Sequence, residues 1–174
     1  MSQSSIEYQR AGARRLALAL ALVSLLGGCG FHLRGAVDVP DAYQPLYIAG
    51  GGPLVEAVRD RLVGSDVRQT SDPTQAGLIL TIYQQKRDSR VVAVDQRGKA
   101  LAYEQRYRFD VAAAGGDGTV LMPRQTLLLE RTFDYNPDVA VLGEEIESEY
   151  IYQDMVDDAA GQVLLRLRVA LERG

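Results

Sequence analysis

The stretch LAYEQRYRFDV, residues 101–111, decides the fold, because apolar and polar side chains alternate along it. One side of the alternation carries Leu101, Tyr103, Tyr107, Phe109 and Val111, and the other carries Glu104, Arg106, Arg108 and Asp110. A repeat of two residues predicts a β-strand with one face on a hydrophobic core and the other face against water or a polar partner.

The segments on either side of this stretch predict two further long strands. Before it, the near-continuous apolar run 78–83 is typical of a strand covered on both faces, and we expect it to extend as far as Val94. Residues 95–98, with the sequence DQRG, form a turn between these two strands. After the stretch, the glycine-rich residues 115–118 close a hairpin into a strand over 120–135. One face of that last strand carries Leu127, Leu129, Phe133 and Tyr135.

Two apolar stripes with helical spacing complete the predicted fold. Residues 144–172 form one long helix, with glutamates in its first turns and arginines near its end, as the helix dipole favours. A short helix begins at Pro53 and ends near Gly64, between short strands over 46–49 and 67–70. The sequence therefore predicts an α+β fold, a two-layer sandwich in which a mixed, mostly antiparallel sheet of four to five strands carries two helices on one face.

The first 28 residues have the pattern of a bacterial secretory signal. Three arginines precede an apolar run over residues 16–26, which ends on the small residues Gly27 and Gly28. This run is shorter than the ~20 apolar residues that a membrane-spanning helix needs. We therefore expect the segment to be removed.

Cys29 directly follows the two glycines, a position that resembles a lipobox, in which the cysteine is acylated and becomes the new N-terminus. Two or more acyl chains make membrane anchoring stable. The alternative is an ordinary signal peptide followed by a buried free cysteine, because cysteine is often buried. Gly30 stands where an aspartate marks inner-membrane retention in enteric-type sorting, so we expect an outer-membrane protein anchored on the periplasmic side. The predicted organisation is a signal over 1–28, a lipidated tether over 29–45 and one domain over 46–174.

Composition and charge exclude several classes of function. The 174 residues include 19 basic and 23 acidic ones, and without the first 28 residues the net charge falls from −4 to −6, which argues against nucleic acid as a partner. Cys29 and His32 are the only residues of their types, so cysteine metal sites and histidine catalysis are disfavoured. A carboxylate pair stays open, but no nucleophile motif or cofactor fingerprint is present. We expect no enzyme, cofactor, metal or catalytic residue.

Basic residues gather around the turn at residues 95–98. The segment from Lys86 to Lys99 contains five basic residues against Asp88 and Asp95. Arginine and lysine at a hairpin tip suit phosphate groups. The other interpretation is a solvated strand end whose charges deter edge pairing.

The run CGFHLRG, residues 29–35, resembles the start of mature proteins of the LptE family, which assembles lipopolysaccharide. The stretch FDYNP, residues 133–137, and the acidic start of the last helix are similar to that family too. The chain differs from some relatives at residues 142–145, which carry acids near the position where those relatives have a lysine.

The resemblance implies a function in lipopolysaccharide transport. It implies that the domain sits as a 1:1 plug inside an LptD-type outer-membrane β-barrel and helps to assemble it. It also implies contacts between lipopolysaccharide and basic residues near the turn. The candidate residues are Arg87, Arg90, Arg97 and Lys99. Two other interpretations stay open: a free envelope lipoprotein that acts as a structural or chaperone module, and an anchored hydrolase.

Overall fold

The computed structural model describes residues 39–135 and 141–173, with side chains in the last helix described from Ile146 onward. All described residues belong to one compact unit spanning Gly35–Gly174. Its elements in chain order are η1 Asp41–Tyr43, β1 Leu46–Ala49, α2 Pro53–Arg61, η2 Pro73–Gln75, β2 Leu78–Val94, β3 Ala100–Gly115, β4 Val120–Asp134 and α3 Val141–Leu171. Within the described ranges, no helix has the length and apolar character needed to span a membrane.

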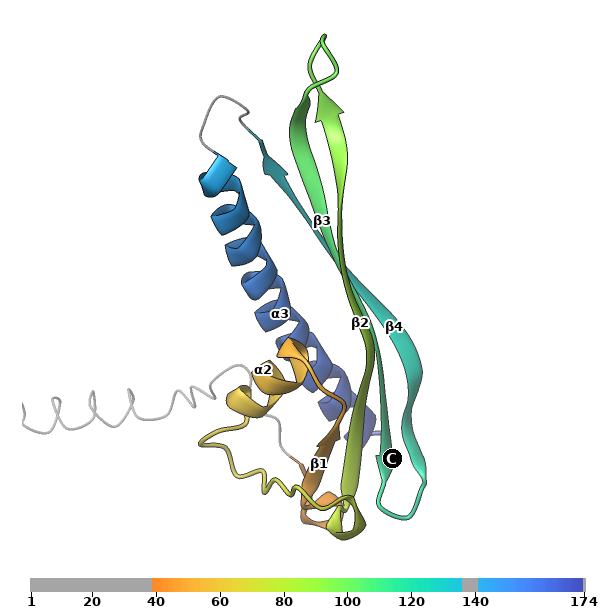
Figure 1. Cartoon of the computed structure of the whole chain (residues 1–174). Helices are drawn as coiled ribbons and strands as arrows, with labels where there is room; N and C mark the ends of the chain where they lie inside the picture. The colour runs from red at the N-terminus through yellow and green to blue at the C-terminus, as the bar shows by residue number, and fades with distance from the viewer. Residues whose placement is uncertain (1–38, 136–140, 174) are drawn as a thin grey trace, which may run out of the picture. The chain divides into compact units, whose positions relative to one another are not determined.

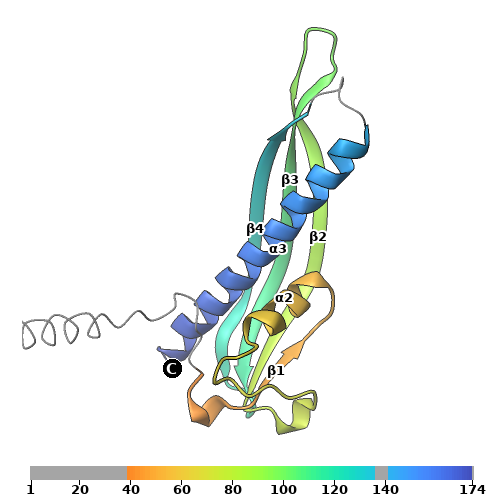
Figure 2. The same ribbon diagram turned by 90° about the vertical axis from the view of Figure 1, so that its left-hand side faces the viewer.

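The four strands form one sheet in the order β1-β2-β3-β4. β1 pairs with β2 in parallel, whereas β2 with β3 and β3 with β4 pair antiparallel. Both α2 and α3 lie on the same face of this sheet (Figures 1 and 2). The predicted α+β two-layer sandwich, with a mixed sheet and two helices on one face, is confirmed.

The hydrophobic core lies between that face of the sheet and the two helices. Alternate residues of the long strands point into it, among them Tyr107, Phe109 and Val111 of β3. The helical stripe enters the core as expected and consists of Met155, Ala159, Val163, Leu167 and Leu171. Burying one such side chain contributes about 1.5–3 kcal/mol relative to leaving it exposed, so this stripe fixes α3 on the sheet.

The expectation that the run 78–83 is covered on both faces is wrong. Leu78, Leu80 and Ile82 are buried, but Ile79, Thr81 and Tyr83 between them are only partly buried. The reason is that both helices occupy one face, so the other face of β2 has no second layer.

The expected strand over 67–70 is also wrong. Only Gln69 forms an isolated parallel bridge, with Leu46. Its neighbours make the backbone hydrogen bonds: Leu46 donates to the carbonyl of Arg68 at 2.8 Å, and Thr70 donates to the carbonyl of Leu46 at 2.9 Å. The chain then turns through η2, and the parallel partner of β1 is β2. The crossover from β1 through α2 therefore ends in the long strand.

An irregularity in β2 decides which residues face the helices. The register with β3 shifts between Tyr83 and Lys86, and Gln84 has a positive φ of 47°. An extra residue of this kind exchanges the two faces of the strand beyond it. Arg87 therefore lies opposite the buried Tyr107 on the helix side, whereas Arg90 pairs with Glu104 on the outer face.

Candidate functional site

The four basic residues singled out from the sequence do not converge on one point. Arg87 lies on the helix side of β2 and Arg90 on the outer face, while Arg97 and Lys99 belong to the turn that joins β2 to β3. Residues three apart on a strand point to opposite faces, so Arg87 and Arg90 cannot bind the same small group.

Arg87 attaches the N-terminal part of α3 to the sheet. Its guanidinium group donates to Glu149 at 2.7 Å and to the hydroxyl of Ser148 at 3.0 Å. It also lies over the ring of Tyr152, 4.3 Å from the centroid. The hydrogen bond from Arg87 is the main reason that the pKa of Glu149 lies below its usual value. Because all these contacts are to α3, Arg87 serves as a structural residue of the two-layer packing.

Gln105 is a buried polar residue that the sequence pattern did not reveal. Its side chain is 1% exposed and points into the same side of the sheet as Tyr107. With its amide oxygen toward Arg87, it accepts from Nε at 2.7 Å and donates to the carbonyl of Ser148 at 3.1 Å. A buried amide costs free energy unless it is paired, so Gln105 and Arg87 depend on each other.

Tyr107 continues these contacts toward α2. Its hydroxyl donates to Gln85 at 2.8 Å, and its ring meets that of Tyr152 edge-on at 5.4 Å. Gln85 in turn accepts from the backbone N–H of Leu54 in the first turn of α2 and donates to the carbonyl of Gly51. Burial raises the pKa of Tyr107 well above its usual value, so the hydroxyl stays protonated and acts as a donor. A chain of polar and aromatic contacts thus joins both helices through the sheet.

The turn between β2 and β3 presents its cations outward. Asp95 accepts from the backbone N–H groups of Arg97 and Lys99, both at 2.8 Å. These bonds, led by the one from Lys99, hold the pKa of Asp95 below its usual value. The Arg97 side chain touches Asp95 at 3.2 Å and remains 77% exposed. Since the backbone supplies the main turn contacts, the two exposed side chains can meet a ligand, Arg97 by exchanging its exposed contact with Asp95.

Exposed apolar side chains accompany these cations. Val91, Val92, Val94 and Leu101, all from the same hairpin, are 42–56% exposed. The end of this hairpin extends beyond the start of α3 and beyond the last residue of β4 (Figures 1 and 2). We call residues 86–108 the basic arm, because they hold seven basic and three acidic residues in a chain of net charge −4.

The outer face of the sheet is polar, as the alternation in residues 101–111 predicts. Arg106 forms ion pairs with Asp88 and Glu130 on the neighbouring strands, at 3.7 and 3.2 Å. Asp110 accepts from Thr126 at 2.6 Å and from Arg124 at 2.7 Å, and both bonds lower its pKa. The remaining cross-strand pair joins Arg90 to Glu104 at 2.7 Å. Charges on this face are therefore mostly neutralised in place.

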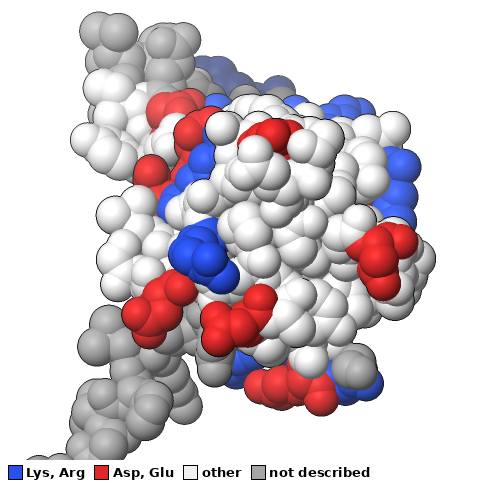
Figure 3. All heavy atoms as spheres, turned by 90° about the horizontal axis from the view of Figure 1, so that it is seen from below, with Lys and Arg blue, Asp and Glu red and all other residues white. Residues whose placement is uncertain are grey.

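The opposite end of the sheet carries little charge. Figure 3 views the end below the strands in Figure 1, near η1 and the β3–β4 loop, and most of that surface is uncharged. Residues 69–85 contain a single charged residue, Asp72, and residues 111–123 contain only Asp117. Both carboxylates accept backbone hydrogen bonds within their own turns, from Thr74 and Thr119. The two sequence ranges that form this end of the sheet are thus nearly uncharged.

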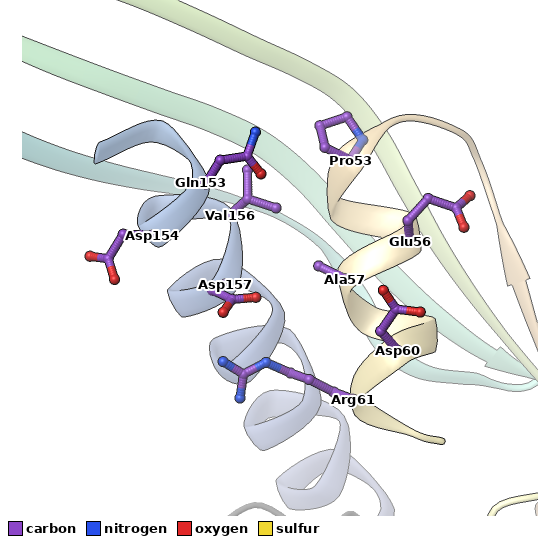
Figure 4. A pocket seen from close by; sticks show the side chains of 9 residues that line it. All are labelled: Pro53, Glu56, Ala57, Asp60, Arg61, Gln153, Asp154, Val156 and Asp157. Atoms are coloured by element: carbon purple, nitrogen blue, oxygen red, sulfur yellow. The ribbon is translucent and has the colours of Figure 1, made fainter. Parts of the chain in front are cut away.

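A groove of about 630 Å³ lies between α2 and α3 (Figure 4). Its charged lining consists of Glu56, Asp60, Arg61, Asp154 and Asp157. Within the part of the chain that the structure describes, no group of three or more histidines, cysteines or carboxylates is placed to hold a metal ion. The groove contains carboxylates but no partner group that would point to a reaction.

Comparisons with known proteins agree with this arrangement of elements. A family model named LptE and described as "Lipopolysaccharide-assembly" matches residues 36–167. The chain belongs to the LptE family. The LPS-assembly lipoprotein LptE of Pectobacterium atrosepticum is 32% identical to it over 164 residues, which cover 88% of this chain and 85% of that protein. The protein of the same name from Photorhabdus laumondii is 32% identical over 158 residues, with the same coverage.

Solved structures of lipoproteins share the fold of this LptE-family chain. Lipoprotein B from Nitrosomonas europaea superposes with a TM-score of 0.63 at 24% identity, over 78% of this chain and 88% of that one. Rare lipoprotein B from Shewanella oneidensis gives a TM-score of 0.63 at 19% identity, over 71% and 92% of the two chains. These likenesses support the fold alone.

Several residues quoted for the family resemblance lie outside the described part of this LptE-family chain. They include Cys29 with the run to Gly35, and Asn136–Pro137. Residues 142–145 lie in α3 by their backbone, and their side chains are likewise outside the description. The described part of the expected tether begins at Val39, which is 2% exposed and belongs to the core cluster.

Proposed function

We propose that this LptE-family chain is a non-enzymatic outer-membrane lipoprotein that plugs an LptD-type barrel, helps to assemble it and contacts lipopolysaccharide during transport. Cys29 carries the acyl anchor. Arg97 and Lys99 at the end of the basic arm contact lipid phosphates, with Arg90 behind them on the outer face. Arg87 contributes through the packing of α3, since its guanidinium group is engaged by Glu149 and Ser148.

The side chains exposed at the end of the basic arm support the lipid contact. It combines exposed cations with the exposed apolar side chains of Val91, Val94 and Leu101. Lipopolysaccharide is an amphiphile with phosphate groups next to acyl chains, so it matches both properties at once. An exposed apolar hairpin without a partner would also be an aggregation hazard, which favours a bound occupant.

The polar outer face supports the plug. Its carboxylates and guanidinium groups pair with one another across three strands, so the face tolerates a wet, polar surrounding. The lumen of a large membrane barrel is such a surrounding. The same face would serve a free lipoprotein equally well in water, so the two cases are separated by experiment.

The deciding experiment places an affinity tag on the C-terminus and solubilises outer membranes in a mild detergent. We expect one large barrel protein to co-purify in equal amount. If nothing stoichiometric co-purifies, the plug is wrong and a free envelope lipoprotein remains. In parallel, Cys29→Ala should abolish incorporation of labelled palmitate into the protein, and incorporation that survives the substitution would contradict the anchor.

The lipid contact is tested by Arg97→Glu with Lys99→Glu. The reversal should weaken binding of purified lipopolysaccharide by about tenfold or more, because two charge-assisted contacts become repulsive. Arg173→Glu is the matched control, since it reverses an exposed cation at the far end of α3. Equal binding by the reversed arm and the control would remove the site.

A further inference from the structure

A second place on the basic arm has a charge arrangement that the turn does not explain. On the outer face, Lys86 lies directly opposite Arg108, and Leu128 lies opposite Arg108 on the next strand. Directly opposed side chains have Cβ atoms about 4.5–5.5 Å apart. Two cations are therefore held side by side, next to an apolar side chain that is 46% exposed.

The neighbouring cations on this face form ion pairs with carboxylates, and among the described residues these two do not. Arg106 is paired with Asp88 and Glu130, Arg90 with Glu104, and Arg124 with Asp110. Within the described ranges, neither Lys86 nor Arg108 makes an ion pair or a side-chain hydrogen bond, and both are exposed. Arg108 interacts electrostatically with Asp110, two residues along β3, but that carboxylate is already hydrogen-bonded by Thr126 and Arg124.

Such a pair costs stability in the absence of an anion. Like charges directly opposite each other across two strands are destabilising. In the described register of β2, β3 and β4, no other directly opposed pair on this face joins two cations. A single phosphate group between the two side chains would reverse the sign of the interaction. Arginine offers a planar fork of donors to such a group, and lysine adds a mobile point charge.

We propose that Lys86 and Arg108 form a phosphate-binding site on the outer face of the sheet, with Leu128 as the apolar contact of a phosphorylated amphiphile. The inference rests on the proposed function, because it adds a second contact for the same class of lipid. The site is distinct from the turn: Val94 lies eight residues beyond Lys86 along the strand, about 27 Å at the rise of an antiparallel strand. One phosphate cannot bridge the two places.

The test uses full-length lipoprotein in nonionic detergent and purified lipopolysaccharide as the probe. All variants are built on Arg97→Glu with Lys99→Glu, so that binding at the turn is removed first. In this background, Lys86→Gln with Arg108→Gln should weaken the remaining binding by about tenfold, the effect expected for the loss of two charge-assisted contacts. Arg59→Gln with Glu56→Gln is the matched control, because it removes an exposed ion pair on α2 and leaves the net charge unchanged.

Thermal unfolding separates this role from a structural one. Neutralising two opposed cations should leave the melting temperature unchanged or raise it, whereas a structural role would lower it. If the double variant does lower it, the single variant Lys86→Gln is measured instead, with a smaller loss of binding expected. Binding unchanged by either variant overturns the proposal.

Two competition experiments identify the source of the phosphate group. Competition by inorganic phosphate would show that the group alone suffices, whereas competition only by phosphatidylglycerol vesicles would assign a lipid headgroup; both support the site. The proposal is overturned if dephosphorylated lipopolysaccharide binds as tightly as the phosphorylated form, both to the Arg97→Glu/Lys99→Glu protein and to the variant that also lacks the Lys86 and Arg108 charges. The proposal is also overturned if Lys86→Gln with Arg108→Gln abolishes co-purification of a barrel protein but leaves lipid binding intact. That result would assign the two cations to a protein interface. If Arg97→Glu with Lys99→Glu does not weaken lipopolysaccharide binding, the proposed contact at the turn is wrong. The effect of Lys86→Gln with Arg108→Gln can still be measured separately.

Discussion

The two halves of the β2–β3 hairpin differ in almost every physical property. In the half nearest the β3–β4 loop, strand residues alternate between the core and a weakly charged outer face. In the other half, the basic arm, charges cover the outer face and apolar side chains near the end lack a helix over them. The change occurs at the irregularity around Gln84. One continuous pair of strands therefore serves for folding at one end and for recognition at the other.

The largest difference between the halves should appear in the free energy of unfolding. Phe109 is fully buried in the core cluster, with its ring against that of Tyr107, so Phe109→Ala should destabilise the protein by about 3–5 kcal/mol. Val94 is 56% exposed in the arm, and Val94→Ala should change stability by about 0.5 kcal/mol or less. Denaturant unfolding followed by circular dichroism measures both. Comparable losses for the two variants would show that the arm is part of the cooperative core.

A pair of glycines tests the backbone that leads into α2. Gly50 has φ of 116°, and an added Cβ would lie 2.5 Å from the carbonyl oxygen of Ile82, so Gly50→Ala should cost about 1–3 kcal/mol. Gly51→Ala is the matched control, since no atom lies within 4 Å of its added Cβ. The melting temperature of each variant is the readout. If Gly51→Ala were the more damaging change, the close approach of this loop to β2 would be wrong.

Arg87 and Arg90 offer the sharpest comparison, because the same residue type occurs three positions apart on opposite faces. Arg87→Ala leaves the buried amide of Gln105 without its partner and should cost about 1–3 kcal/mol. Arg90→Ala breaks an exposed pair with Glu104 and should cost about 0.2–1 kcal/mol. Hydrogen exchange of amides in residues 146–152 should accelerate only in the Arg87 variant. Equal acceleration in both would contradict the attachment of α3 through Arg87.

Local signals in the sequence were sufficient for most of the fold. Alternation in 103–111, the four-residue stripe of α3 and the turn at Asp95–Gly98 all depend on neighbours in the chain, and each is confirmed. The expectation that Leu101 faces the core is wrong: it is 42% exposed and Ala102 is buried instead, near register shifts between β2 and β3. The irregularity at Gln84 carries no comparable signal. Without it, Arg87 would point outward and Arg90 toward the helices, so the sequence could identify the basic arm but not the face of each cation.

The contacts that sequence reasoning missed are long-range ones. Gln105 occupies an odd-numbered position between Tyr103 and Tyr107, so its place in the alternation could have marked it as buried. Its partners Arg87 and Ser148 are far away along the chain, and only the packing of α3 on the sheet brings them together. The opposed cations Lys86 and Arg108 likewise follow from the register of β2 and β3.

The smallest expected effect concerns the pH dependence of the Arg87 contact. The pKa of Glu149 is lowered in the folded state, chiefly by the hydrogen bond from Arg87, so the folded protein favours the ionised carboxylate. A depressed pKa contributes stability that is present above the pKa of the unfolded chain and is lost as pH falls through the folded value. As the pH falls below the ordinary titration range of glutamate, the free energy of unfolding of Glu149→Gln should therefore decrease less steeply than that of the wild-type protein. Glu147→Gln, an exposed neighbour on α3, is the control and should keep the wild-type slope. Parallel slopes for all three proteins would show that the carboxylate of Glu149 does not stabilise the helix through Arg87.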